Sequence, residues 1–214
     1  MEVEHWFPTT MWNTKLDNID NQKLEQFSIK MMNKDEKGVI KSNRGGWQSD
    51  GILRGSNEEF DKLVGVILDK VNEASDQVRL GKMKLVNIWI NVNGKGGYNT
   101  LHTHLRSAFS GVYYVKAGPG QGGFHFERND GAEHHLPNTT SLDNCNTFNV
   151  FSWIHTSESG KLIIFPSWLR HSVQQNESDE YRISISFNTF SIDALGSEQS
   201  LTHLDIRRIM NESN

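Results

Sequence analysis

Two segments of this chain alternate strictly between polar and apolar residues. In residues 85–93, LVNIWINVN, three asparagines and a tryptophan share one face, and aliphatic residues share the other. In residues 181–188, YRISISFN, one face carries an arginine, two serines and an asparagine, and the other carries two isoleucines and a phenylalanine. A period of two is the pattern of a β-strand whose faces meet different surroundings. Each segment is therefore expected to separate an apolar core from a polar cavity.

The rest of the pattern predicts a mainly β fold with flanking helices. Apolar spacing predicts helices over residues 16–36 and 57–76, the second capped by Asn57. About eight short strand-like segments with Gly, Pro and Asn turns follow them, which favours an antiparallel sandwich or jelly roll. Residues 1–15 are expected to pack as an edge strand or arm, and residues 41–56 are loop by composition. The N-terminal helices are expected to pack outside the sheets.

Length and composition bound the class of protein. The 214 residues fit one domain, with helical support over 1–80, a jelly-roll core over 81–190 and a tail over 191–214. No apolar run is long enough to span a membrane, and the first ten residues do not resemble a secretory signal. A single cysteine favours a reducing compartment, so a cytoplasmic location is expected. The net charge of −4, without a basic block, does not indicate nucleic-acid binding.

Three histidines are candidate metal ligands. His102 and His104 lie two residues apart, so on one strand both imidazoles can reach a single point. His171 follows a buried strand and the turn FPSW, where a side chain can be held rigidly. The alternative is that the first two histidines lie on a solvated strand face or are satisfied by a core hydrogen bond.

Arg182 is a candidate receptor for an anion. It begins the last alternating strand, with Ser184 beside it on the same face. An arginine facing a barrel cavity needs an anionic partner, and guanidinium binds carboxylate in a bidentate way. Next to a metal, it suits a small dicarboxylate that chelates the metal at one end and is anchored at the other. The alternative is an internal salt bridge to Asp179 or Glu180.

The ordered motifs resemble a known family. The order His-x-His, SGVYYV, a Gly-rich turn, GKLIIFPSWLRHSV and RISISFN is similar to the 2-oxoglutarate- and Fe(II)-dependent oxygenases. Within them, it resembles the prolyl-4-hydroxylase-like branch and a group of oxygenases found in bacteria and phages. The resemblance runs from about Asn87 to Asn188, and SNRGGWQS nearer the N-terminus also resembles that group. It implies a double-stranded β-helix that uses Fe(II), 2-oxoglutarate and dioxygen to hydroxylate an unactivated C–H bond, with release of succinate and CO2.

The resemblance also implies roles for individual residues. His102 takes the place of the first metal-binding histidine and His171 that of the distal one. Arg182 matches the arginine that binds the far carboxylate of 2-oxoglutarate, with Ser184 as its helper. Tyr114 lies where related enzymes hydrogen-bond that carboxylate, and Asn91 lies near the chelating end. The implied metal ligands are His102, His104 and His171, and the implied cosubstrate residues are Arg182, Ser184, Tyr114 and Asn91.

One residue departs from the family pattern. The wider superfamily has His-x-Asp where this chain has His104, which leaves an Fe(II) site one charge more positive. Glu127, Asp130 or Glu133 could supply a carboxylate instead. Two other functions stay open: a three-histidine dioxygenase of the cupin type that uses no 2-oxoglutarate, and a non-catalytic metal-binding jelly roll.

The expected primary substrate and the expected source follow only from the resemblance. The expected partner is a small-molecule cosubstrate, and a peptide or protein side chain such as proline is the candidate primary substrate. The expected location is the cytoplasm of a bacterium, or of the host cell if the chain is phage-encoded.

Overall fold

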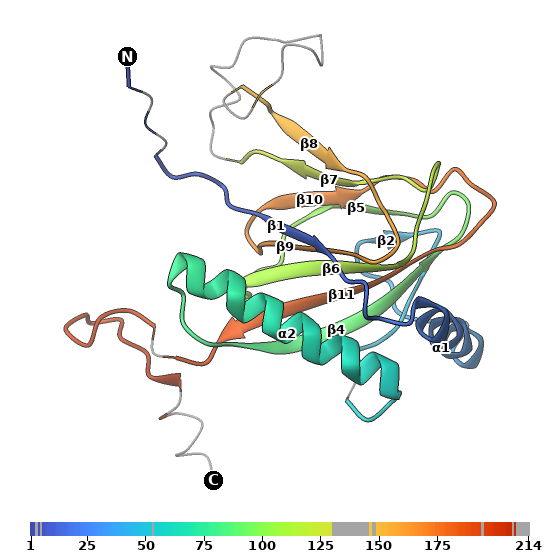
Figure 1. The fold of residues 1–214 in the computed structure, drawn as a ribbon, viewed down its shortest axis with the longest axis horizontal. Helices are drawn as coiled ribbons and strands as arrows, with labels where there is room; N and C mark the ends of the chain where they lie inside the picture. Colours follow the sequence, from blue (N-terminus) through green and yellow to red (C-terminus); the bar gives the residue numbers. More distant parts are fainter. Residues whose placement is uncertain are drawn as a thin grey trace.

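Two antiparallel sheets face each other across a shared interior (Figure 1). The computed structural model describes residues 1–214 except 3, 5, 53, 130–145, 147–148, 194, 207 and 209–214. The larger sheet has the order β1 (Trp12–Lys15), β9 (Lys161–Pro166), β6 (Phe109–Lys116), β11 (Arg182–Ser191), β4 (Met83–Asn93) and β3 (Trp47–Gln48). The smaller sheet has the order β2 (Asn43–Arg44), β5 (Tyr98–His102), β10 (Arg170–Val173), β7 (Phe124–Glu127) and β8 (Ser152–His155).

The two alternating segments are neighbours at the centre of the larger sheet. In the register of β11 and β4, Arg182 lies opposite Asn93 and Ser184 lies opposite Asn91. The polar face of both strands lines a pocket between the sheets. The opposite face of β11, which includes Ile185 and Phe187, is completely buried in the main core under the helices. The predicted separation of an apolar core from a polar cavity is confirmed.

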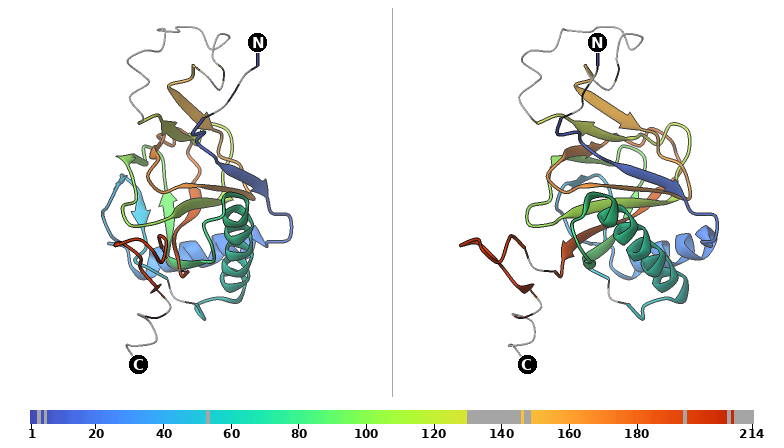
Figure 2. Two further views of the ribbon diagram at one scale, coloured as in Figure 1. Left: turned by 90° about the vertical axis from the view of Figure 1, so that its left-hand side faces the viewer. Right: turned by 60° about the vertical axis from the view of Figure 1, so that its left-hand side comes forward.

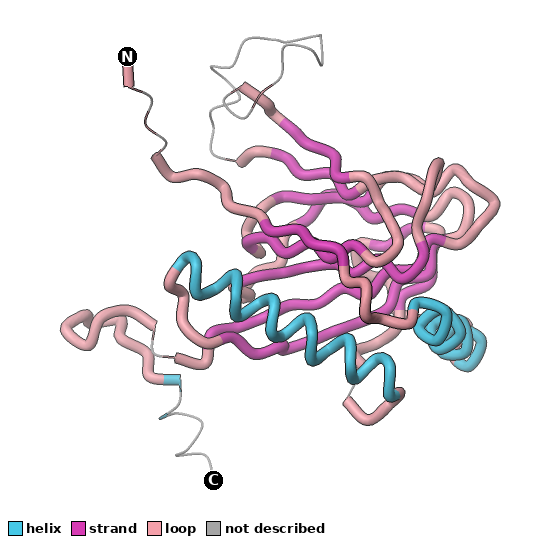
Figure 3. The backbone as a smooth tube through the Cα atoms, in the orientation of Figure 1, coloured by secondary structure: helices cyan, strands magenta, loops and turns pink. Residues whose placement is uncertain are grey.

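Helices α1 (Asn21–Lys34) and α2 (Glu58–Val78) cover the outer face of the larger sheet (Figures 2 and 3). Asn57 caps α2 as predicted, because its side chain accepts a hydrogen bond from the N–H of Phe60. Helix α1 begins at Asn21 and not at residue 16. Asp20 is its N-cap, because the Asp20 side chain accepts hydrogen bonds from the backbone N–H groups of Gln22 and Lys23. None of the described helices is both long and apolar enough to cross a bilayer.

Residues 41–56 are not all loop. They contain the short strands β2 and β3, which pair with β5 and β4 at the sheet edges. Trp47 is buried in β3, and its indole N–H donates to the Asp35 carbonyl at 2.6 Å. The turn-rich composition of this segment does not predict strands, because β2 and β3 form by pairing with strands that are distant in sequence. The predicted N-terminal edge strand is confirmed by β1, which pairs with β9.

The double-stranded β-helix has a second, smaller core between the sheets. It includes the buried side chains of Phe124, Phe126 and Phe165, which pack beside the polar pocket. The rings of Phe124 and Phe165 form part of the apolar lining of the pocket.

Gly111 on β6 tests how tightly the strands around the pocket pack. A methyl group there would lie 2.7 Å from the Ile163 carbonyl oxygen and closer still to the Phe187 ring. Because neither the paired backbone nor the buried ring can move freely, we expect Gly111→Ala to lower the free energy of unfolding by about 1–3 kcal/mol. Urea denaturation measures this change.

Gly118→Ala is the matched control, because nothing lies within 4 Å of a methyl group at that position. We expect this variant to stay within about 0.5 kcal/mol of the wild type. Equal stability of the two variants would contradict the tight packing of β6 against β11.

Candidate metal centre

Three imidazoles converge between the sheets. His102 ends β5 and lies directly opposite His171 on β10. His104 follows two residues later in irregular backbone, where its N–H donates to the Ser167 carbonyl at 3.0 Å. Ligand nitrogens of the three side chains all lie within 4.8 Å of one another. The expectation that His102 and His104 share one strand is wrong, since β5 ends at His102, but both reach the same point.

Hydrogen bonds at Nδ1 of the three rings leave Nε2 as the nitrogen that can bind a metal. Nδ1 of His102 bonds to the Thr100 carbonyl at 2.7 Å, and Nδ1 of His171 bonds to the Leu169 carbonyl at 2.8 Å. Nδ1 of His104 bonds to the side-chain oxygen of Asn188. A backbone carbonyl can only accept, so His102 and His171 carry the proton on Nδ1 and keep a lone pair on Nε2. With the Asn188 oxygen facing its ring, His104 has the same arrangement. The Nε2 atoms of His104 and His171 are 3.2 Å apart.

The charge state of the three rings suits a bound cation. Burial lowers the pKa of all three imidazoles, to about 4 for His104 and about 3 for His171. At neutral pH the rings are therefore uncharged and offer lone pairs without repelling a metal ion. Three convergent neutral imidazoles fit a divalent transition metal, for which imidazole is a common ligand.

No carboxylate joins this cluster in the part of the chain that the structure describes. On β7, Glu127 lies on the face opposite the buried phenylalanines. Its carboxylate is 3.4 Å from Nη2 of Arg170. Glu127 is therefore engaged elsewhere, whereas Asp130 and Glu133 lie outside the described residues.

Arg182 and Tyr114 present unsatisfied donors to the same interior. The guanidinium of Arg182 is buried, and its Nη1 donates to the carbonyls of Gln121 and Gln174. Within the described chain, Nη2 of Arg182 and the hydroxyl of Tyr114 have no hydrogen-bond partner. Burial raises the pKa of Tyr114 to about 12, so its hydroxyl keeps its proton at neutral pH. Buried donors without partners are costly, so this arrangement fits an anionic ligand.

The internal salt bridge considered for Arg182 does not form among the described residues. Asp179 pairs with Lys95 at 2.8 Å, and Glu180 pairs with Lys116 at 3.0 Å. Burial lowers the pKa of Arg182, which is the expected direction for a cation without a counterion. The guanidinium is therefore available to a ligand.

The histidines and the arginine line one pocket between the two sheets. Asn91 and Ser184 also line it from neighbouring strands. The amide of Asn91 donates to Ser186 at 3.1 Å, while its oxygen has no partner among the described residues. One pocket thus combines convergent ring nitrogens with anion-binding donors. A dicarboxylate with a metal-chelating end matches these groups.

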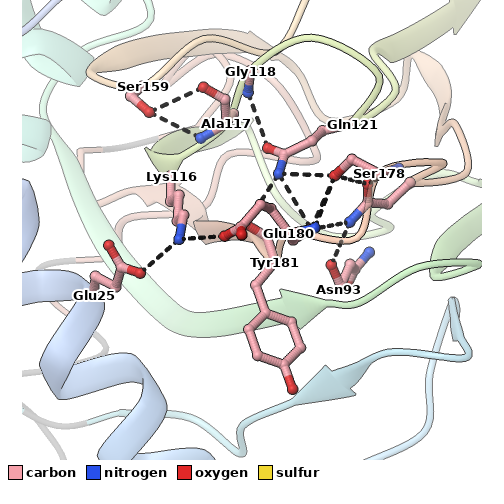
Figure 4. A network of polar contacts seen from close by, with 11 residues as sticks. Glu25, Asn93, Lys116, Ala117, Gly118, Gln121, Ser159, Ser178, Glu180 and Tyr181 are labelled. Carbon is pink, nitrogen blue, oxygen red and sulfur yellow. Dashed lines mark hydrogen bonds and ion pairs between the residues drawn. The ribbon is translucent and has the colours of Figure 1, made fainter.

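Gln121 is a supporting residue that sequence reasoning missed. Figure 4 shows its side chain within a network that ties the turn after β6 to the segment before β11. Its oxygen accepts from the Gly118 N–H at 2.9 Å, and its amide donates to the carbonyls of Glu180 and Tyr181, each at 3.2 Å. Its own carbonyl accepts from Arg182. Gln121 therefore links the turn to the start of β11 and holds the arginine in place.

Comparison with known proteins agrees with this geometry. A family profile described as "Putative 2OG-Fe(II) oxygenase" matches residues 87–188. That segment contains the three histidines and Arg182. Over these residues, the chain is similar to the 2-oxoglutarate- and Fe(II)-dependent oxygenases. The description of this family names 2-oxoglutarate and Fe(II), and the three convergent histidines fit an iron ion. A comparison with curated proteins found no match.

Solved structures of this oxygenase superfamily share the fold. A Pseudomonas putida prolyl-4-hydroxylase is 17% identical with a TM-score of 0.62, covering 86% of this chain and 93% of its own. The epimerase SnoN from nogalamycin biosynthesis is 11% identical with a TM-score of 0.63, covering 90% and 81%. The viral collagen prolyl hydroxylase from Paramecium Bursaria Chlorella virus-1 is 14% identical with a TM-score of 0.56, covering 84% and 96%. These similarities confirm the predicted double-stranded β-helix.

Proposed function

We propose that this oxygenase hydroxylates an unactivated C–H bond with a three-histidine iron centre. In this proposal, His102, His104 and His171 hold Fe(II). The observation that supports it most strongly is the pairing of two features in one pocket. Three Nε2 lone pairs converge at one place, and the unpartnered donors of Arg182 and Tyr114 face the same interior. A site that only held a structural metal would not need the second feature.

We assign the cosubstrate to the residues that line the same pocket. Arg182 binds the far carboxylate of 2-oxoglutarate by charge-assisted hydrogen bonds, with Tyr114 and Ser184 as further donors. Asn91 lies nearer the chelating end. This assignment satisfies the buried donors that otherwise lack partners. It also neutralises the buried guanidinium, for which the described residues supply no acid.

The chain itself contributes position, charge and exclusion of water. When bound, Fe(II) and 2-oxoglutarate supply the oxidising chemistry with dioxygen, and succinate and CO2 are the co-products. The three imidazoles stay neutral at physiological pH, so they are ready to bind the cation without losing protons. The aromatic cluster of Phe124, Phe126 and Phe165 shields one side of the pocket from water. No acid or base residue is required for these tasks.

A three-histidine dioxygenase that uses no 2-oxoglutarate is the second candidate. It is favoured by one observation, the absence of a carboxylate from the ligand cluster in the described residues. Such an enzyme would have no use for a buried guanidinium with an open donor. The two candidates therefore differ in what Arg182 does, and that difference can be measured.

Arg182→Leu separates the two candidates. We expect the variant to bind Mn(II) as the wild type does, because Arg182 is not a ligand. Its affinity for 2-oxoglutarate should fall at least about 30-fold, since removal of one partner of a buried charge pair costs about 2 kcal/mol or more. Calorimetric titration of metal-free protein with Mn(II) gives the metal affinity, and titration of the Mn(II)-loaded protein with 2-oxoglutarate gives the cosubstrate affinity.

Arg79→Leu is the matched control, because Arg79 caps the end of α2 and does not line the pocket. It should bind 2-oxoglutarate like the wild type. If Arg182→Leu keeps the wild-type affinity as well, Arg182 is not the carboxylate receptor and the second candidate is preferred.

For the substrate, we propose a peptidyl side chain, with proline as the first candidate. Two of the solved relatives are prolyl hydroxylases by name, which supports this class. The shared fold alone does not select it, because SnoN is named an epimerase. We expect a proline-rich peptide to gain one oxygen atom from 18O2 in a reaction that needs 2-oxoglutarate. Mass spectrometry detects the added 18O. If succinate forms but the peptide contains no 18O, the peptides tested are not substrates.

A further inference from the structure

The three imidazoles are not held by equivalent groups. His102 and His171 each bond through Nδ1 to a backbone carbonyl two residues earlier in the chain. A carbonyl can only accept, so the proton position on these two rings is fixed by the backbone. His104 instead bonds to the side chain of Asn188, which comes from a different strand. An amide side chain can present either its oxygen or its NH2 group. The protonation pattern of His104 therefore depends on how one side chain is turned.

A pair of buried serines contacts the Asn188 amide on the side of β6. Ser110 lies opposite Asn188 in the register of β6 and β11, and its hydroxyl donates to the Asn188 oxygen at 2.7 Å. The hydroxyls of Ser110 and Ser167 are 2.8 Å apart, and both residues are buried. When Ser167 donates to Ser110, the Ser110 proton points at Asn188. The amide oxygen then accepts from both Ser110 and Nδ1 of His104.

The opposite orientation of the amide would disable the ligand. An NH2 group facing His104 would donate to Nδ1, and the proton of the neutral ring would move to Nε2. A protonated Nε2 has no lone pair for a metal. His104 is also stacked against the ring of Trp89, with ring centroids 5.8 Å apart, so it cannot readily turn to use its other nitrogen.

We propose that Asn188 is a positioning residue that keeps the lone pair of His104 on Nε2 and so makes the third histidine a competent ligand. This inference rests on the proposed iron centre. Asn188 lies six residues after Arg182 on the same face of β11. One strand thus supplies both the guanidinium for the cosubstrate and the acceptor that sets the third ligand. The neutral amide does this without adding a buried charge.

Co(II) binding to the otherwise metal-free protein tests the proposal without any turnover. Asn188→Leu removes the acceptor at similar volume, and we expect its Co(II) affinity to fall about 10- to 100-fold. Asn188→Asp restores an acceptor and should return the affinity to within a few-fold of wild type or better. Calorimetry gives these dissociation constants.

The proton position on His104 gives a second readout that needs no metal. Long-range 1H–15N spectra of the imidazoles should show the proton on Nδ1 of His104 in the wild type. In Asn188→Leu, the proton should move wholly or partly to Nε2, while His102 and His171 keep theirs on Nδ1. A merely structural role for Asn188 would not shift one ring selectively.

Asn87 supplies the matched controls, because it lies opposite Asn188 in the register of β4 and β11 and is exposed. Asn87→Leu and Asn87→Asp should leave both readouts unchanged. If Asn188→Leu does not fold, Ser110→Ala replaces it. That variant removes the hydroxyl that orients the amide, so it should show mixed proton positions on His104 and an intermediate loss of Co(II) affinity.

The outcomes separate this inference from the proposed function. Wild-type Co(II) affinity together with an unchanged His104 proton in Asn188→Leu would overturn the role of Asn188. A wild-type protein that binds no Co(II) would instead overturn the metal centre. In that case, the spectra of the metal-free protein still decide whether Asn188 sets the proton position.

Discussion

The pairing of β11 between β4 and β6 is the constraint on which the site depends. The apolar face of β11 is sealed beneath the helices, so its polar face has to point into the space between the sheets. That face carries Arg182 at one end and Asn188 at the other. A slip of one residue in this register would put the guanidinium in the core and the isoleucines in the pocket. The stability of the core and the orientation of the site are therefore set by the same strand pairing.

The buried guanidinium of Arg182, with one donor that has no partner among the described residues, is the clearest indication that the pocket binds an anion. Removing a cation from water is expensive, and two backbone carbonyls satisfy only part of Arg182. The nearby acids are engaged with surface lysines. An anionic ligand supplies the missing interaction, and 2-oxoglutarate, a cofactor of this superfamily, is such an anion. Among the described residues, the histidine cluster contains no negative ligand like that of the usual His-x-Asp pattern, so the proposed centre would carry one more positive charge than that pattern gives.

Much of this arrangement was predictable because it depends on local periodicity. Alternation in residues 85–93 and 181–188 placed Arg182 and Asn91 on the pocket face, and spacing brought His102 and His104 together. What the sequence could not reveal depends on contacts between distant segments. Strands β2 and β3 form by pairing with β5 and β4. Gln121 lies in a turn, where no periodic pattern of residues marks its role. The position of His104 beyond the end of β5 follows from its bond to Ser167, which is far away in sequence.

Binding of Fe(II) and then of 2-oxoglutarate tests the three-histidine centre most directly. Metal-free protein is titrated anaerobically with Fe(II) and then with 2-oxoglutarate, while the visible charge-transfer band of the chelate is followed. We predict that the band appears in the wild type and is absent in His171→Ala. Binding of Fe(II) without any band in the wild type would contradict the account, because the three-histidine centre would then not accept 2-oxoglutarate.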